Sequence, residues 1–213
     1  MQGESRTGDM LAGDASMNPL RSGRYGELVT DASVGRFSNI VRQGKIFTAS
    51  MQAGAAFGTA LTATAVTFTL YNPSSSSVYL AVLQAWFQMS ANQTTTTNAP
   101  IVVYAANVDT AAAIPATTTA ITVRSALLGG SAGTGVVYSA ATLPAAPIVV
   151  RVFPWGFACQ NGGTVVQSGN PTQIDNVDGA LVLKPNSCLT LQGIATSTAI
   201  TGIAGMTWAE LTI

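Results

Sequence analysis

The chain has 213 residues, and hydrophobic side chains make up 47% of them, enough to build the core of one large domain. Charged side chains make up only 8%, against about 25% in an ordinary soluble domain, and the formal net charge is zero. This balance excludes the basic surface that binding to nucleic acid or an anionic membrane requires, and it favours association with other subunits.

The charges are concentrated at the N-terminal end. Of the nine basic and nine acidic side chains, eleven lie in residues 1–45 and seven in residues 46–213. Residues 1–45 are polar, with apolar side chains scattered at no sustained period, so this segment cannot build its own core. We expect an extended arm that orders against a partner, with one short helix within residues 28–41. Its basic side chains are the expected contacts with that partner: Arg21, Arg24, Arg36, Arg42 and Lys45.

Residues 46–213 show the pattern of β-structure. In residues 64–70 apolar side chains alternate with threonine, which is the period of a half-buried strand. Residues 72–77 (NPSSSS) have the composition of a turn, and residues 78–89 are apolar on both faces, which predicts a central strand. Further strands are predicted, in chain order, at residues 101–106, 120–128, 147–153, 164–166, 180–183, 187–191 and 205–211.

Turn residues separate most of these strands. Residues 129–135 (GGSAGTG) predict a flexible connection, and Pro185-Asn186 predicts a tight turn. Eight or nine short strands without a convincing amphipathic helix indicate an all-β fold, and their number suits a jelly roll of two packed sheets. We therefore predict a jelly-roll β-sandwich over residues 46–213, preceded by the arm of residues 1–45.

A membrane span, a signal peptide and a disulfide each fit the sequence less well than the alternatives. No charge occurs between Phe47 and Val108, but threonine at every second or third position suits strands better than a membrane span. The N-terminus lacks the apolar segment of a signal peptide, so we expect assembly in a cytoplasm. Cys159 and Cys188 could form one disulfide, but two buried free thiols are the favoured interpretation.

The sequence offers little for catalysis. It contains no histidine, which excludes Ser-His-Asp and Cys-His triads and leaves too few ligands for zinc. A carboxylate pair for polysaccharide cleavage remains formally open. However, Asp175 and Asp178 are expected to form a turn before Gly179, and Glu210 is expected at the surface near the end of the last strand. We expect no enzyme, no catalytic or metal site, and no cofactor.

One aromatic residue is a candidate for recognition. Trp155 lies in Phe-Pro-Trp-Gly-Phe, a turn that could present its indole to a sugar or to a pocket of a partner. The alternative is an aromatic corner packed under a loop. Trp86 and Trp208 lie within predicted strands and are expected in the core.

Several stretches resemble structural proteins of tailed bacteriophages. They are residues 70–83 (LYNPSSSSVYLAVL), residues 178–191 (DGALVLKPNSCLTL), the closing residues 205–211 (GMTWAEL) and the opening residues 43–50 (QGKIFTAS). The resemblance covers residues 45–213. It implies a capsid decoration or cement protein, which commonly forms a trimer on the head surface and locks neighbouring capsid subunits.

The partners expected from this resemblance are the major capsid protein and further copies of the chain itself, with no nucleic acid and no membrane. The expected location is the capsid surface of a virion assembled in the host cytoplasm. A host-recognition module, either the tip of a fibre or a capsid-borne adhesin that binds cell-surface sugar, is the alternative.

Overall fold

The structure is a computed structural model, and it describes residues 37–91, 100–107, 119–154, 172–195 and 200–212. The chain divides into two units, Met1–Ser38 and Asn39–Ile213. The predicted arm falls almost entirely outside the described residues. The second unit is built from strands, and the short helix α1 (Ser38–Arg42) precedes its first strand.

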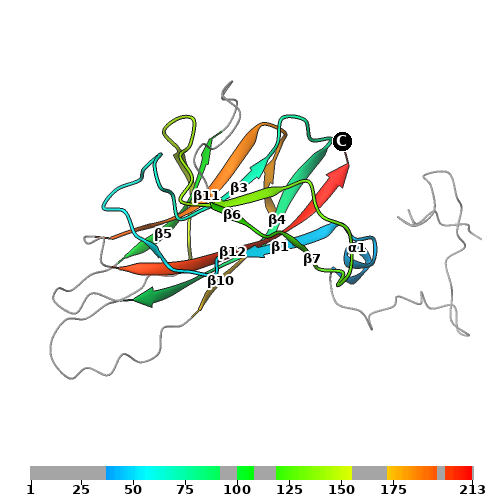
Figure 1. Ribbon diagram of the computed structural model, residues 1–213, viewed down its shortest axis with the longest axis horizontal. Helices are drawn as coiled ribbons and strands as arrows, with labels where there is room; N and C mark the ends of the chain where they lie inside the picture. The colour runs from blue at the N-terminus through cyan, green and yellow to red at the C-terminus, as the bar shows by residue number, and fades with distance from the viewer. Residues whose placement is uncertain (1–36, 92–99, 108–118, 155–171, 196–199, 213) are drawn as a thin grey trace, which may run out of the picture. The chain divides into compact units, whose positions relative to one another are not determined.

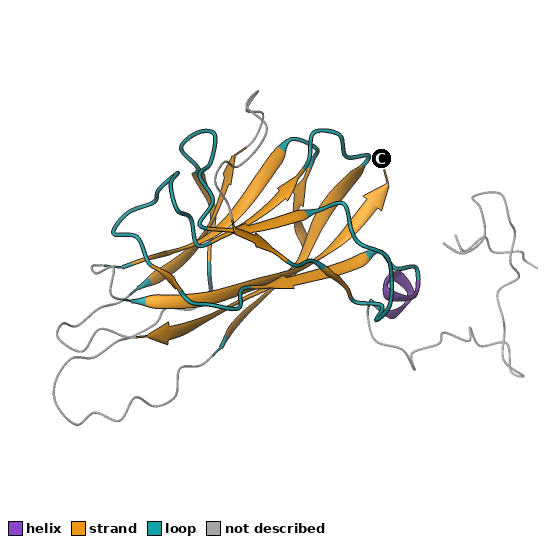
Figure 2. Cartoon of the chain, in the orientation of Figure 1, coloured by secondary structure: helices purple, strands orange, loops and turns teal. Residues whose placement is uncertain are grey.

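Two antiparallel sheets pack face to face to form a sandwich (Figures 1 and 2). The first, named the β4 sheet after its long central strand, runs in the order β10 (Gln173–Leu183), β4 (Val78–Ala91), β12 (Thr201–Thr212), β1 (Ile46–Ser50) and β7 (Arg124–Ser125), with β2 (Ala55–Ala56) also paired to β12. The second, named the β5 sheet, runs in the order β6 (Thr119–Ile121), β8 (Val136–Ser139), β3 (Phe68–Asn72), β11 (Ser187–Ile194), β5 (Ile101–Asn107) and β9 (Ile148–Val152).

The connectivity is that of a jelly roll. Strand β1 pairs with β12, β3 with β11, β4 with β10 and β5 with β9, all antiparallel. The four pairs are therefore nested in sequence: the first strand pairs with the last, and each following strand pairs with one that comes earlier from the C-terminal end. Successive pairs alternate between the two sheets. Eight strands wound in this way form two Greek keys. The predicted all-β jelly-roll sandwich is therefore confirmed.

The core lies between the sheets and follows from the alternation of side chains along each strand. On β4, Leu80 and Val82 point inward, and after a register shift between Val82 and Gln84 so do Ala85, Phe87 and Met89; all five are buried. Strand β4 is hydrogen-bonded on both sides, to β10 and β12. The prediction of a central strand over residues 78–89 is therefore confirmed.

The outer face of the β5 sheet is covered by the chain itself. Residues 62 and 63 lie over it: the Gln192 side chain accepts from Thr62 N–H (3.1 Å) and donates to Thr62 C=O (2.9 Å), and Leu143 N–H donates to Ala63 C=O (2.7 Å). A second small core forms beneath them, from Val66, Tyr71, Ala141, Leu143 and Cys188. Cys188 is a free, buried thiol, and its burial raises its pKa to about 11.

Two predicted turns are confirmed by their hydrogen bonds. The Asn72 side chain donates to Val78 C=O (2.8 Å) and to Leu183 C=O (3.0 Å), which fixes the 72–77 turn against the end of β10. Asn186 adopts a positive φ of 63° and donates its N–H to Asn72 C=O (2.9 Å). The left-handed conformation is one that asparagine tolerates better than most residues.

Some element boundaries differ from the prediction. The single strand expected at residues 120–128 is two short strands, because the chain leaves the β5 sheet after β6 and joins the β4 sheet as β7. Strand β10 begins at Gln173, well before the predicted residue 180. The helix α1 begins at Ser38, near the end of the expected range 28–41. The strand expected at residues 164–166 lies outside the described residues.

No helix in the part of the chain that the structure describes is long and apolar enough to cross a membrane.

Candidate interaction surface

Strand β9 forms an exposed apolar edge. Among the described strands it is the last of the β5 sheet, where it pairs with β5. Four of its five side chains are apolar and open to solvent: Ile148 (73% exposed), Val149 (43%), Val150 (46%) and Val152 (57%). An edge strand also presents unpaired backbone N–H and C=O groups along its free side. These four residues and that free side are called the β9 edge below.

The β9 edge combines exposed apolar side chains with some of the protection that natural edges carry. Proteins usually blunt such strands with lysine, proline or inward-pointing charge. Here Pro147 and Pro154 stand just outside the strand, and a register shift opposite Tyr104 and Ala105 interrupts the ladder. The only charged side chain in the strand is Arg151. The four exposed apolar side chains make this edge a candidate contact surface.

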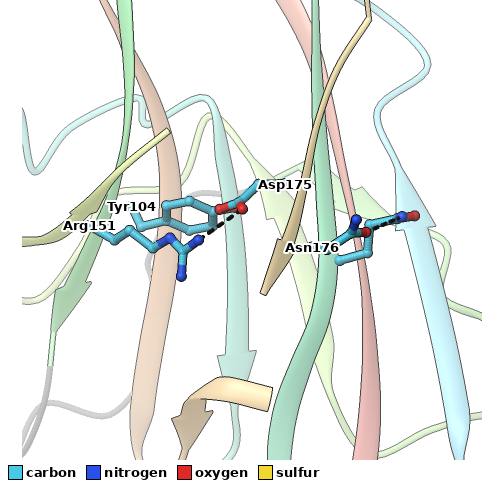
Figure 3. A network of polar contacts seen from close by, with 5 residues as sticks. Tyr104, Arg151, Asp175 and Asn176 are labelled. Atoms are coloured by element: carbon cyan, nitrogen blue, oxygen red, sulfur yellow. Dashed lines mark hydrogen bonds and ion pairs between the residues drawn. The ribbon is translucent and has the colours of Figure 1, made fainter. Parts of the chain in front are cut away.

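A polar network neutralises that one charge (Figure 3). The Arg151 guanidinium donates to Asp175 Oδ1 at 2.9 Å, and the Tyr104 hydroxyl donates to Asp175 Oδ2 at 2.9 Å. Asp175 lies on β10, whereas Arg151 and Tyr104 lie on β9 and β5, so the carboxylate ties the two sheets together. The edge strands β9 and β10 therefore lie on the same side of the sandwich.

The network is rigid because its central groups are buried. Tyr104 is fully buried, and its ring stacks on Phe153 with centroids 5.5 Å apart. Burial and the adjacent Asp175 carboxylate raise the Tyr104 pKa well above its ordinary value, so the hydroxyl remains a neutral donor. The expectation that Asp175 forms a turn is wrong, since it is a buried partner of an arginine and a tyrosine.

Asp178 does lie at an irregularity. It has a φ of 53°, Gly179 has a φ of 81°, and the register of β10 against β4 shifts between Asn176 and Leu181. The pair therefore forms a bulge within β10 where a turn before the strand was expected. The left-handed φ values explain why aspartate and glycine stand here.

Glu210 is buried, contrary to the expected surface position. Its Oε1 accepts hydrogen bonds from the N–H groups of Thr134 (2.7 Å) and Gly135 (2.9 Å). These contacts fasten residues 129–135, predicted as a flexible connection, to strand β12. Gly133 packs so closely on Phe47 and Glu210 that a Cβ atom would meet them at 2.7–2.9 Å. The carboxylate is occupied as a loop anchor.

Within the described ranges, no group of three or more cysteine, aspartate or glutamate side chains could hold a metal ion. The two buried carboxylates there, Asp175 and Glu210, each have hydrogen-bond partners of their own.

Two of the predicted basic contacts are described. Arg42 ends α1 and is exposed, and Lys45 is half-buried just before β1. Between them Gly44, with a φ of 68°, caps the helix: its N–H donates to Val41 C=O (2.8 Å) and Lys45 N–H donates to Ile40 C=O (3.2 Å). These two hydrogen bonds fix the backbone between Arg42 and Lys45. The other predicted site residues, Arg21, Arg24, Arg36 and Trp155, lie outside the described residues, as does Cys159.

The two described tryptophans differ. Trp208 is fully buried in the core, as predicted. Trp86 was expected in the core as well, and this is wrong: its neighbours Ala85 and Phe87 point inward, so Trp86 points to the outer face of the β4 sheet and is partly exposed. An apolar run in a central strand does not reveal which alternate residues face out.

Comparison with known proteins identifies no relative: no family model, no curated protein and no solved structure matches the chain.

Proposed function

We propose that this chain is a non-enzymatic structural protein of a bacteriophage virion, which binds the outer surface of the capsid and stabilises it as a homotrimer. The β9 edge carries this proposal. An apolar strand edge whose one charged residue is ion-paired, on a module with so few charges, is a surface suited to permanent burial in an assembly.

Self-association would bury the β9 edge. A neighbouring copy that aligns a strand along β9 would supply partners for its free backbone groups and would cover the side chains of Ile148, Val149, Val150 and Val152. The ion pair of Arg151 with Asp175 supports this, because the strand then brings no unpaired charge into the contact. Four other described charged residues lie elsewhere on residues 46–213: Arg124, Asp178, Lys184 and Glu210.

Contact with the capsid would come from the basic residues before the first strand. Arg42 is exposed and Lys45 is half-buried, and both lie at the capped end of α1. Guanidinium and ammonium groups recognise acidic patches through charge-assisted hydrogen bonds. Arg21, Arg24 and Arg36 would extend this contact along the shell.

Co-sedimentation with empty heads tests the proposal. The wild-type chain should pellet with the heads, and the double variant Arg42→Ala/Lys45→Ala should pellet several-fold less at physiological salt. Lys184→Ala, which removes an exposed lysine next to the end of β10, at the other end of the β4 sheet from β1 and β7, is the matched control and should bind like the wild type. A wild-type chain that stays in the supernatant would refute the capsid role.

A further inference from the structure

The indole ring of Trp86 lies flat against the outer face of the β4 sheet. Trp86 pairs with Gly205 on β12, and a Cβ atom on Gly205 would meet the indole atoms Cε2, Nε1 and Cζ2 at 2.4–2.6 Å. The ring therefore lies down over the neighbouring strand instead of standing upright on its own. One face of the indole packs on Gly205, which is buried, and Trp86 itself stays partly exposed.

The strand register surrounds this indole with hydrogen-bonding side chains. Along β4 the residues two positions away are Gln84 and Gln88. On β12, Thr207 is opposite Gln84, and on β10, Ile174 is opposite Trp86 and Asn176 is opposite Gln84. All point to the same outer face, since side chains two apart share a face. The surface formed by Trp86 with Gln84, Gln88, Thr172, Ile174, Asn176 and Thr207 is called the Trp86 platform.

The amides of the platform are held in place. Gln84 Nε2 donates to Asn176 Oδ1 at 2.9 Å, a contact visible beside the ion-pair network in Figure 3, and the Thr172 hydroxyl donates to Gln88 Oε1 at 3.2 Å. The hydrogen bond between Gln84 and Asn176 uses neither Gln84 Oε1 nor Asn176 Nδ2. An acceptor and a donor of fixed position therefore flank the indole on one side.

The platform is uncharged. None of its seven side chains ionises, so it offers no cation for a phosphate or a carboxylate. Single-stranded nucleic acid, which also stacks on aromatic rings, requires a basic groove along its backbone. A neutral pyranose ring fits instead: its C–H face is apolar and its rim of hydroxyl groups both donates and accepts hydrogen bonds.

We propose that the Trp86 platform binds a neutral polysaccharide, with a sugar ring stacked on the Trp86 indole and its hydroxyl groups hydrogen-bonded to Gln84, Gln88 and Asn176. This activity is separate from the proposed capsid role, because the platform lies on the outer face of the β4 sheet whereas the β9 edge belongs to the β5 sheet. Ligand sites commonly combine one apolar surface with a few placed polar groups in this manner.

Native gel electrophoresis of the full chain through gels containing a neutral glucan, mannan or galactan tests the proposal. At least one of the three should retard the wild type, and hyaluronan, an acidic polysaccharide, should not bind. Trp86→Ala should weaken the association constant at least about tenfold, as loss of a central tryptophan does in other binding sites. Gln84→Ala should weaken it less.

The matched control is Val182→Ala, which removes an exposed side chain from the outer face of the same sheet but outside the platform, and should be retarded like the wild type. Circular dichroism and urea unfolding establish that the Trp86→Ala chain is folded. A wild type that runs unretarded in all three gels overturns the proposal, as does equal retardation of Trp86→Ala. It is likewise overturned if Trp86→Ala reduces self-association while no polysaccharide is bound, because the face is then an interface between copies.

Discussion

The hydrogen bond between Tyr104 and Asp175 joins the two sheets on the side where both edge strands end, and its removal gives a quantitative test of the fold. Tyr104→Phe deletes the hydroxyl that donates at 2.9 Å to the carboxylate. A hydrogen bond to a charged group contributes about 1.5–3 kcal/mol to stability. The free energy of unfolding should therefore fall by about that amount.

Asp175→Ala should cost more. It leaves the hydroxyl of Tyr104, which is fully buried, without its acceptor, at a penalty of about 1–3 kcal/mol. It also removes the partner of Arg151, but that side chain is 36% exposed, so water replaces much of the ion pair and the added loss is about 1 kcal/mol or less. The total expected is about 2–4 kcal/mol.

Urea unfolding of the wild type, the two single variants and the double variant completes a double-mutant cycle. The double variant should be more stable than the sum of the single losses predicts, by about 1.5–3 kcal/mol, since the same bond is deleted in each single variant. Additive losses, equal to within about 0.5 kcal/mol, would show that the two groups do not interact and that the sheets are not tied at this position.

Three further outcomes follow from buried groups. Glu210→Ala should lower the free energy of unfolding by about 2–4 kcal/mol in urea titrations, because two backbone N–H groups lose their acceptor, and Glu210→Gln, which keeps an oxygen there, should lose less. Stability should decline as pH rises from about 9 to about 11, since the Cys188 thiol ionises in the unfolded chain before the folded one. Cys188→Ala should lessen that decline between about pH 9 and 10, below the range in which the tyrosines of the unfolded chain ionise, and an unchanged slope there would contradict the burial of the thiol. Gly193→Ala should destabilise by about 1–3 kcal/mol, because its Cβ would meet the Phe57 ring at 2.6 Å; a thermal melt matching the wild type would refute that packing.

Local patterns in the sequence were enough to predict the architecture. The alternation and turn residues around Asn72 predict a turn and then a long central strand, and the structure has both. The number of short strands indicated a jelly roll, and the strand pairing confirms it. These features depend on neighbours in sequence, where side-chain period and turn chemistry are informative.

The surface features could not be predicted from the sequence because they depend on how distant strands pair. Asp175 and Arg151 are 24 positions apart and meet only when β9 and β10 become edges on the same side of the sandwich. Trp86 lies in a run that is apolar on both faces, so only the pairing with Gly205 places its indole on the outside. Glu210 is buried because residues 129–135 fold back onto the last strand, which no local pattern indicated.

The central claim, that this module assembles with copies of itself through the β9 edge, is tested most directly by sedimentation equilibrium of the full chain. The wild type should have about three times the mass of the 21.7 kDa chain. Ile148→Lys/Val152→Lys places two charges on the edge and should shift the protein to monomer, whereas Leu128→Lys, at a loop position that is 93% exposed, should leave the trimer intact. A monomeric wild type, or a trimer that survives both lysines on β9, would contradict the account.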